Sequence, residues 1–363
     1  MFKLLKNIKV RSFGVSGDKL LSIRDKKITL YQNDKIIFEN NVEGDYTTIF
    51  KLQNDSFLIR KDDNTSLKLE NKQETYSLFS FMDNEPVDEI AERGDYVLST
   101  KYISYYPVEL ITELKKTADK TVVFSSTLSA HYSMIKDVLI VIEHKKLTAY
   151  KLENGSLKCQ FDLAPYFIGY TTTDQSKLED KIQNYIGLIG NVLWIGLSSG
   201  RLLAIDVENG SLVYQLGFKE SDFPNFPYEI KEGDYLPFGE LMQLDEDKGE
   251  IIGLRDKYFM KVDLDQSEPR RKYIDVGQSM AAHKISSSYR NYSFPIDEQF
   301  IYFCDDRQGK IGVFDREKKE VIWSYELDME RDGIVQILEM KYANNRWYVL
   351  DRNDTLHIFE RIL

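Results

Sequence analysis

A stretch near the middle of the chain, VLWIGLSSGRLLAIDVENGSLVYQLGF (Val192–Phe218), constrains the fold more than any other segment. Its alternating apolar residues and two Gly-containing turns predict three consecutive strands, which form an antiparallel meander. The spacing A-x-D-x-x-N-G-x-x-x-Y begins in this stretch at Ala204, and it returns in AYKLENGSLKC from Ala149 and, more loosely, in VFDREKKEVIW from Val313. A supersecondary unit that recurs along the chain indicates a repeat fold.

Pairs of short strands separated by polar turns follow one another along the whole chain. Eight such pairs are predicted: Lys19–Ile23 with Lys27–Tyr31, Ser56–Arg60 with Ser66–Glu70, Tyr96–Thr100 with Ile103–Tyr106, Val138–Ile142 with Leu147–Leu152, Val192–Leu197 with Arg201–Val207, Ile251–Leu254 with Tyr258–Leu264, Phe300–Cys304 with Lys310–Phe314, and Trp347–Leu350 with Thr355–Phe359. Most pairs have a weaker strand before them and an outer strand after them, and four antiparallel strands per repeat is the plan of a β-propeller.

We therefore predict an all-β fold, a single closed β-propeller domain over residues 1–363 with eight four-stranded blades. Seven blades stay an alternative because Pro107 interrupts the third pair of strands. The last repeat lacks an outer strand, and Phe2–Lys6 has the pattern to supply it. The N-terminal strand is then expected to close the last blade, which removes the open edges that favour aggregation.

The repeated spacing resembles the blade signature of the quinoprotein-like β-propellers (PQQ-repeat, WD40-like), A-x-D-x-x-T-G-x-x-x-W. This superfamily contains quinone-dependent alcohol dehydrogenases, outer-membrane assembly lipoproteins and other binding proteins. The dehydrogenases use a vicinal disulfide beside their cofactor, whereas Cys159 and Cys304 are the only cysteines here and are far apart. The lipoproteins carry a lipidated N-terminal cysteine, and Met1–Val10 contains none. The resemblance thus implies the fold and a non-catalytic member without a cofactor.

Composition narrows the classes of partner. The chain has 48 basic and 59 acidic side chains, a net charge of −11, which repels nucleic acid and anionic lipid. No stretch approaches the roughly 18 apolar residues that a membrane-spanning helix needs. The N-terminus, MFKLLKNIKV, has no small-residue cleavage site, and two distant thiols suit a reducing compartment. We expect a cytoplasmic protein that binds neither nucleic acid nor membranes.

Three connections between an outer strand and the next inner strand are much longer than the others, and they are predicted insertions at 164–184, 219–240 and 277–297. In a propeller such connections emerge on one face. They contain five of the eight prolines and many aromatic residues, a composition typical of preorganised binding loops. We predict that they contact a protein partner through Phe167, Tyr170, Phe223, Phe226, Tyr228, Tyr235, Phe238, Tyr289 and Tyr292. The alternative is that these rings fold down as core beneath their own loops.

A fourth insertion, Val108–Lys120, has apolar residues at helix-like spacing and predicts a short amphipathic helix. It would cover blade edges or, alternatively, dock on a partner.

Enzymatic motifs are missing from the sequence. It contains no Gly-rich phosphate loop, no H-E-x-x-H or Cys-x-x-Cys metal motif and no G-x-S-x-G elbow. The four histidines are scattered, with His283 in a predicted loop, and the acidic pairs Asp305-Asp306 and Asp351–Asp354 lie at inner turns, where Asp commonly stabilises the backbone. We predict no catalytic, cofactor-binding or metal-binding residue, and hence a non-enzymatic scaffold. The alternative function is a small-molecule or metal-binding enzyme that uses the axial channel.

Overall fold

The chain is organised as consecutive antiparallel sheets in the computed structural model, which describes residues 1–51, 56–63, 65–72, 75–81, 89–106, 108–167, 169–171, 177–216, 242–265, 268–286, 294–328 and 337–362. Two compact units can be distinguished. The first unit comprises Met1–Asp137, Lys151–Ser156 and Ile337–Leu363, and the second comprises Val138–Tyr150 and Leu157–Gln336. The boundary between them falls in the fourth sheet.

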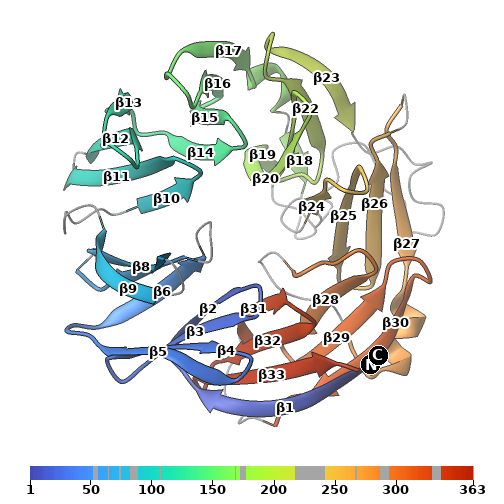
Figure 1. Cartoon of the computed structure of the whole chain (residues 1–363). Helices are drawn as coiled ribbons and strands as arrows, with labels where there is room; N and C mark the ends of the chain where they lie inside the picture. The colour runs from blue at the N-terminus through green and yellow to red at the C-terminus, as the bar shows by residue number, and fades with distance from the viewer. Residues whose placement is uncertain are drawn as a thin grey trace. The chain divides into compact units, whose positions relative to one another are not determined.

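The sheets that contain the N-terminal third and the C-terminal end of the chain have four strands each (Figure 1). The first is β2 (Ser12–Ser16), β3 (Lys19–Arg24), β4 (Lys27–Gln32) and β5 (Lys35–Asn41); the second is β6 (Tyr46–Lys51), β7 (Phe57–Lys61), β8 (Ser66–Lys72) and β9 (Thr75–Phe81); the third is β10 (Glu89–Arg93), β11 (Tyr96–Tyr105), β12 (Val108–Lys116) and β13 (Val122–Ser126); the eighth is β31 (Ile337–Ala343), β32 (Arg346–Asp351), β33 (Thr355–Arg361) and β1 (Phe2–Lys9).

The remaining sheets follow the same meander. The fourth is β14 (His131–Ile135), β15 (Val138–Glu143), β16 (Lys146–Lys151) and β17 (Leu157–Asp162); the fifth is β20 (Ile182–Ile189), β21 (Val192–Leu197), β22 (Leu202–Asp206) and β23 (Ser211–Leu216); the sixth is β24 (Met242–Asp245), β25 (Glu250–Arg255), β26 (Tyr258–Asp263) and β27 (Arg271–Asp275); the seventh is β28 (Phe300–Asp305), β29 (Lys310–Asp315) and β30 (Glu320–Glu326).

The seventh sheet has three strands in the part of the chain that the structure describes, and Ile296 adds a single bridge to Ile301 at the position of the inner strand. Eight meanders in sequence, each built inner to outer, are the blades of a β-propeller. The predicted fold class and the choice of eight blades over seven are confirmed.

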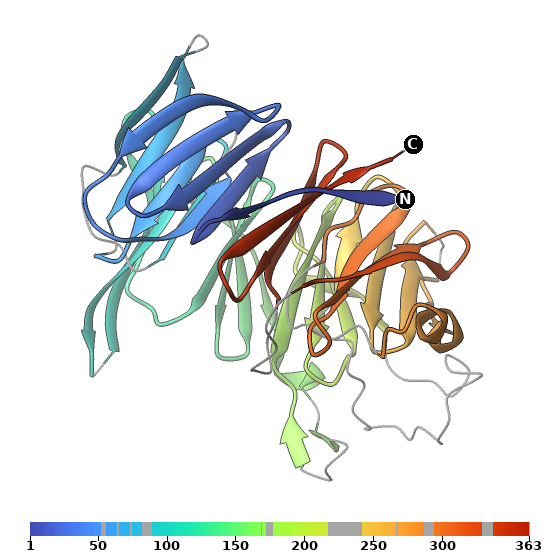
Figure 2. The same ribbon diagram turned by 90° about the horizontal axis from the view of Figure 1, so that it is seen from below.

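The N-terminal strand completes the last blade. β1 pairs with β33 along its whole length, from Phe2 opposite Arg361 to Lys9 opposite Thr355. The predicted closing strand Phe2–Lys6 is therefore confirmed, and it extends three residues further. The Met1 carbonyl accepts the Ile362 N–H at 2.8 Å, so the two ends of the chain lie side by side (Figures 1 and 2).

The repeated sequence spacing has one structural cause in all three copies. Its first residue pairs across to its last, Ala204 with Tyr214, and a β-bulge follows directly. The equivalent pairs in the other copies are Ala149 with Cys159 and Val313 with Trp323, again followed by a bulge. The spacing therefore records the register between the third and fourth strands of a blade.

The turn inside this spacing needs a left-handed residue. Gly155, Gly210 and Lys319 occupy the same repeat position with φ of 66°, 68° and 60°. A Cβ at Gly210 would lie 2.6 Å from the carbonyl oxygen of Gln160 in the preceding blade. Glycine is thus favoured at that copy by both backbone conformation and close packing.

Apolar side chains between adjacent blades form the core. In the first unit, Phe13, Val15 and Leu20 pack with Leu350 and Ile358 of the eighth blade. In the second unit, Trp194 and Ala204 of the fifth blade pack with Ile251, Met260 and Val262 of the sixth. The strands β15 and β21, each the second strand of its blade, are buried on both faces, and this explains their nearly continuous apolar sequences.

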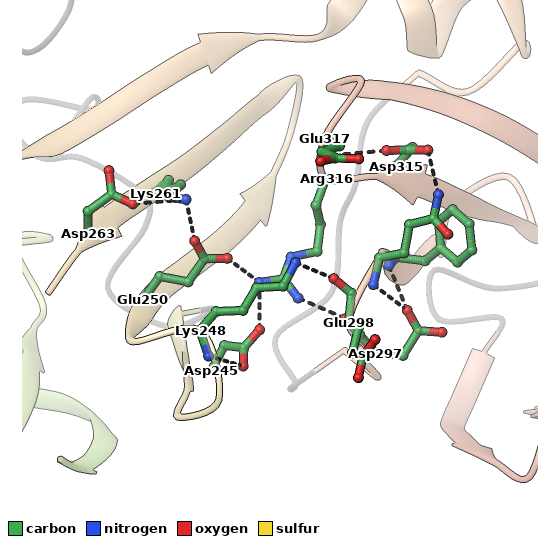
Figure 3. Close-up of polar contacts among 12 residues, drawn as sticks. Asp245, Lys248, Glu250, Lys261, Asp263, Asp297, Glu298, Asp315, Arg316 and Glu317 are labelled. Atoms are coloured by element: carbon green, nitrogen blue, oxygen red, sulfur yellow. Dashed lines mark hydrogen bonds and ion pairs between the residues drawn. The ribbon is translucent and has the colours of Figure 1, made fainter. Parts of the chain in front are cut away.

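One buried charge joins the sixth and seventh blades within the second unit (Figure 3). Arg316 leaves the turn after β29 and donates to Asp245 at 2.6 Å, to Glu250, and to the Asp297 carbonyl oxygen at 2.7 Å. Its side chain is only 4% exposed. Lys261 pairs with the second oxygen of Glu250, so the two carboxylates have two cations.

The prediction of a helix in the fourth insertion is wrong. Val108–Lys116 is the strand β12, and it pairs with β11 from Tyr96 opposite Lys116 to Tyr105 opposite Val108. Leu110, Thr112 and Leu114 are buried at a period of two. The predicted third pair of strands is wrong as well. The two predicted strands, Tyr96–Thr100 and Ile103–Tyr106, lie mostly within the single strand β11 (Tyr96–Tyr105), and β11 pairs with β12.

Among the described residues, none of the helices has both the length and the apolar composition to cross a membrane.

Candidate functional site

The three long insertions occupy equivalent positions in three successive repeats. The first follows the outer strand β17 and precedes the inner strand β20, the second lies between β23 and β24, and the third between β27 and the bridge at Ile296. Each is therefore an outer-to-inner connection, as predicted, and they serve three consecutive blade boundaries. All three lie in the second unit.

The first insertion contains a 3-10 turn, η2 (Ala164–Tyr166), and a small hairpin, β18 (Gly169–Thr171) with β19 (Lys177–Glu179). The hairpin projects beyond the ends of the blade strands (Figure 2), and its second strand is exposed throughout. Tyr166 stacks on Phe161 of β17 with ring centroids 5.3 Å apart. This ring folds back on its own blade, as the core alternative predicted, whereas the hairpin does not.

Phe167 is the one predicted contact residue whose side chain the structure describes. Its ring is half-buried and lies under the ammonium of Lys145, 5.9 Å from the centroid. Lys145 also pairs with Glu179 at the end of the hairpin. Tyr170 lies in β18 opposite Leu178, and only its backbone is described. Phe167 and Tyr170 therefore lie close together in sequence, at the start of the hairpin in the first insertion.

A buried ion pair holds the C-terminal end of the first insertion. Asp180 accepts the Ser199 N–H at 2.9 Å and pairs with Arg201, and both charged side chains are at most 6% exposed. Arg201 also donates to Ser199 Oγ at 3.0 Å. These contacts tie the insertion to the turn between β21 and β22. Because a buried pair with several hydrogen bonds tolerates little displacement, this end of the insertion is rigid.

The third insertion begins with the helix α1 (Gly277–Ala282), which packs beside β30. Ser279 Oγ accepts the Val321 N–H at 2.7 Å, and His283 Nδ1 lies 3.2 Å from Ser324 Oγ. Met280, at 1% exposure, joins an apolar cluster with Ile285 and Phe294 from the far end of the insertion. Phe294 is therefore part of the core, and His283 contacts the outer strand of the seventh blade.

A second buried carboxylate fixes this insertion. Asp305, which is fully buried, accepts the Ser286 N–H at 3.0 Å and the Ser286 hydroxyl at 2.6 Å. On the other side, Gln243 of the sixth blade donates to the Phe294 carbonyl oxygen at 2.9 Å. Both ends of the segment between Ser286 and Phe294 are thus held, and that segment contains two of the predicted aromatic residues.

The other predicted contact residues lie outside the described residues. They are Phe223, Phe226, Tyr228, Tyr235 and Phe238 in the second insertion and Tyr289 and Tyr292 in the third. The sequence did not single out Asp180 and Arg201 as a pair. A charged residue in a polar turn is expected to be exposed to solvent. Only the fold shows that these two side chains meet in the interior.

The acidic turns have structural partners. Asp305 holds the third insertion, and Asp351 accepts N–H groups of Asn353 at 2.8 Å and Thr355 at 3.0 Å. These contacts confirm the turn-stabilising role expected for Asp at such positions. Within the described part of the chain, no group of three or more His, Cys, Asp or Glu side chains is arranged to hold a metal ion.

Comparison with known proteins supports the fold. No protein-family model matches this chain, and no curated protein matches its sequence. Among solved structures, the computationally designed protein Ika8 has a TM-score of 0.59 at 9% identity, covering 97% of this chain and 96% of its own. BamB from Moraxella catarrhalis, a PQQ-like β-propeller, has a TM-score of 0.58 at 11% identity, over 99% and 98% of the two chains.

A third similar structure is Sqt1 from Saccharomyces cerevisiae, with a TM-score of 0.57 at 10% identity over 98% of this chain and 96% of that one. The similarity extends over nearly the whole length of both chains. At such low identity the likeness extends to the fold alone, and a fold hosts many functions.

Proposed function

We propose that this protein is a non-enzymatic scaffold that binds a protein partner through the three insertions of the second unit. The observation that carries the proposal is the pair of buried anchors, Asp180 and Asp305. Asp180 holds one end of the first insertion and Asp305 holds the third insertion at Ser286, and both insertions contain predicted aromatic contact residues. Rigid support lowers the entropy cost of binding, and aromatic side chains supply most of the binding energy at protein interfaces.

The proposal includes the finer predictions made from the sequence. The chain would be a non-catalytic relative of the quinoprotein-like propellers, it would act in the cytoplasm, and it would belong to a bacterial multiprotein complex. Support comes from the shared blade register of the repeats and from the similarity to BamB and Sqt1, which are propeller structures.

The test measures binding and stability on the same variants. Phe223, Phe226, Tyr228, Tyr289 and Tyr292 are each replaced by Ala in the full chain, which is then used to recover partners from an extract of its source cells. Truncation of a central aromatic residue is expected to weaken the complex by about 2 kcal/mol or more, roughly 30-fold in Kd, with an unchanged melting temperature.

Tyr214→Ala is the matched control, because Tyr214 lies outside the three insertions and its ring stacks on Trp194 within the fifth blade. It is expected to lower the melting temperature and to leave partner recovery unchanged. If the five variants behave like the control, their rings are core and the interface proposal is wrong. Substitution of the charged residues Lys219, Glu220 and Asp222 of the second insertion should change mainly the association rate.

A further inference from the structure

A polar groove runs between the last and first blades of the first unit. Two clefts of about 640 Å³ and 590 Å³ adjoin there and share Lys9, Val10, Arg24 and Asp25 in their linings. One wall is the end of β1 and the other is the face of β3, β4 and β5. The chain passes from the eighth blade to the first at Val10 and Arg11, which also line the groove. Their backbone N–H groups donate to the carbonyl oxygens of Asp354 and Ile23 respectively.

The β1 wall is an open sheet edge. β1 is the terminal strand of its sheet, and it pairs on one side with β33. No strand among the described residues pairs with its other side, so this side of the strand can accept an added strand. Such an edge binds an extended peptide through the main chain, and the neighbouring side chains then select the sequence.

Positive charge is concentrated at this end of the chain. Residues 1–40 contain nine Lys and Arg against four Asp and Glu, a net charge of +5 in a chain of net −11. Five basic and four acidic side chains line the two clefts. The local excess is opposite in sign to the rest of the protein, which is the pattern expected of a binding site for an acidic partner.

Most ion pairs in the groove are exposed and therefore exchangeable. Arg24 contacts the adjacent Asp25 at 3.0 Å with its side chain 61% exposed, and Arg11 lies 3.9 Å from Asp45 with 51% exposed. Surface pairs of this kind contribute only about 0–1 kcal/mol, so an incoming carboxylate can replace them. Lys26 is exposed at a left-handed turn position, and none of the described carboxylates pairs with it.

We propose that this groove binds an acidic, extended segment of a protein partner. The segment adds as a strand to the free edge of β1 and places carboxylates on Arg11, Arg24 and Lys26. A peptide fits better than a long polyanion, because the remaining chain is strongly negative and would repel nucleic acid. The groove shares no residue with the insertions, so this site is additional to the scaffold surface.

Fluorescence anisotropy with defined probes tests the proposal. The probe is a fluorescein-labelled decapeptide of alternating Glu and Thr, compared with one of alternating Lys and Thr, a single-stranded oligonucleotide of equal charge, and phosphatidylserine vesicles. We expect the Glu-Thr peptide to bind at least tenfold more tightly than each comparator. Tighter or equal binding of the oligonucleotide or the vesicles would overturn the peptide assignment, and so would no binding at all.

Charge-reversal variants locate the site. The double variant Arg24→Glu with Lys26→Glu should weaken Glu-Thr binding at least tenfold. The matched control, Lys146→Glu with Lys318→Glu, changes the net charge by the same amount at exposed positions outside the groove and should change binding less than twofold. Equal loss in both would show a non-specific charge effect. Melting temperatures of both variants establish that they fold, and Arg24→Ala with Lys26→Ala repeats the test with a milder change.

Backbone addition is tested with the peptide. Two N-methylated versions carry methyl groups on the odd or on the even amides. Because a free strand edge uses alternate amides of the added strand, one version should lose binding at least tenfold and the other less. Equal affinity of both methylated peptides and the parent would overturn strand addition at β1.

Discussion

His357 Nε2 lies 2.8 Å from the carboxylate of Asp351, and both side chains are almost completely buried in the eighth blade. The other oxygen of Asp351 accepts the backbone N–H groups of Asn353 and Thr355. Burial opposes ionisation of this carboxyl, but the hydrogen bonds from His357 and the backbone outweigh it and lower the pKa of Asp351. The turn between β32 and β33 therefore depends on a negatively charged Asp351.

The first prediction concerns pH. A carboxyl whose pKa is lowered by folding stabilises the fold above its unfolded pKa, near 3.8, and this contribution is lost as the pH falls through the folded value. Asp351→Asn should cost about 1–3 kcal/mol at pH 7. The difference from the wild type should shrink below about pH 4. Urea unfolding between pH 7 and pH 3 measures it, and a difference independent of pH would contradict the role of the charge.

The second prediction concerns the buried Arg316. Replacing it by Met leaves the carboxylates of Asp245 and Glu250 buried with one cation fewer, and the expected loss is about 3–5 kcal/mol. Lys318→Met, two residues away on the exposed turn, should stay within about 0.5 kcal/mol of the wild type. Chemical denaturation measures the free energy of unfolding of both variants. A cost below about 1 kcal/mol for Arg316→Met would argue against a stabilising role of the buried Arg316 ion pairs.

The third prediction uses the equivalent turns of the repeat. Gly210→Ala should destabilise the protein by more than about 1 kcal/mol, because φ is left-handed and the new Cβ would meet the Gln160 carbonyl. Lys319→Gly at the same repeat position should be stabilising by up to about 1 kcal/mol. Opposite shifts in melting temperature are the expected result, and equal shifts would show that backbone conformation does not control these turns.

The fourth prediction concerns closure of the last blade. Phe2 is 8% exposed and packs edge to face on Trp347 at 6.1 Å, whereas Leu5 is 38% exposed at a bulge in the same strand. Phe2→Ala should cost about 3 kcal/mol and Leu5→Ala less than about 1 kcal/mol. Deletion of Met1–Ile8 should cost more than either, because it removes the buried Phe2 together with most of the strand that pairs with β33. Comparable melting temperatures for all three would refute the closing role of β1.

The fifth prediction is that residues 1–363 unfold as one domain. Trp347 lies in the first unit and Trp194 in the second, both buried, so each reports on its own unit. Variants that retain only one of them, with the other and Trp323 replaced by Phe, should give coincident unfolding curves. Separate midpoints would show two domains that unfold independently.

Strands at the centre of blades could be predicted closely from the sequence. Leu193, Trp194 and Ile195 are buried in succession, since both faces of an inner strand are covered, and the flanking Gly-containing turns set its length. Closure was predictable for the same reason, because a repeat that ends one strand short requires a partner from elsewhere.

The failure at Val108–Lys116 has a specific cause. Thr112 is fully buried and hydrogen-bonds to Thr100 across the sheet at 2.9 Å, so a polar residue occupies an inward position. This hides the period of two and leaves apolar positions that fit a helix equally well. Prediction of the candidate site from the sequence was limited in a similar way. Its anchors are polar residues, and their burial depends on segments that are far apart in the sequence.

The adjacency of Met1 and Ile362 in one sheet has a practical meaning for handling the protein. A linker of a few residues from Ile362 to Met1 would span the ends without disturbing β1 or β33. New ends could then be opened at a tight exposed turn such as Gly190-Asn191, producing circular permutants. Reporter groups fused at Met1 and after Ile362 would emerge together, so a pair of fluorophores there would follow separation of β1 from its blade directly.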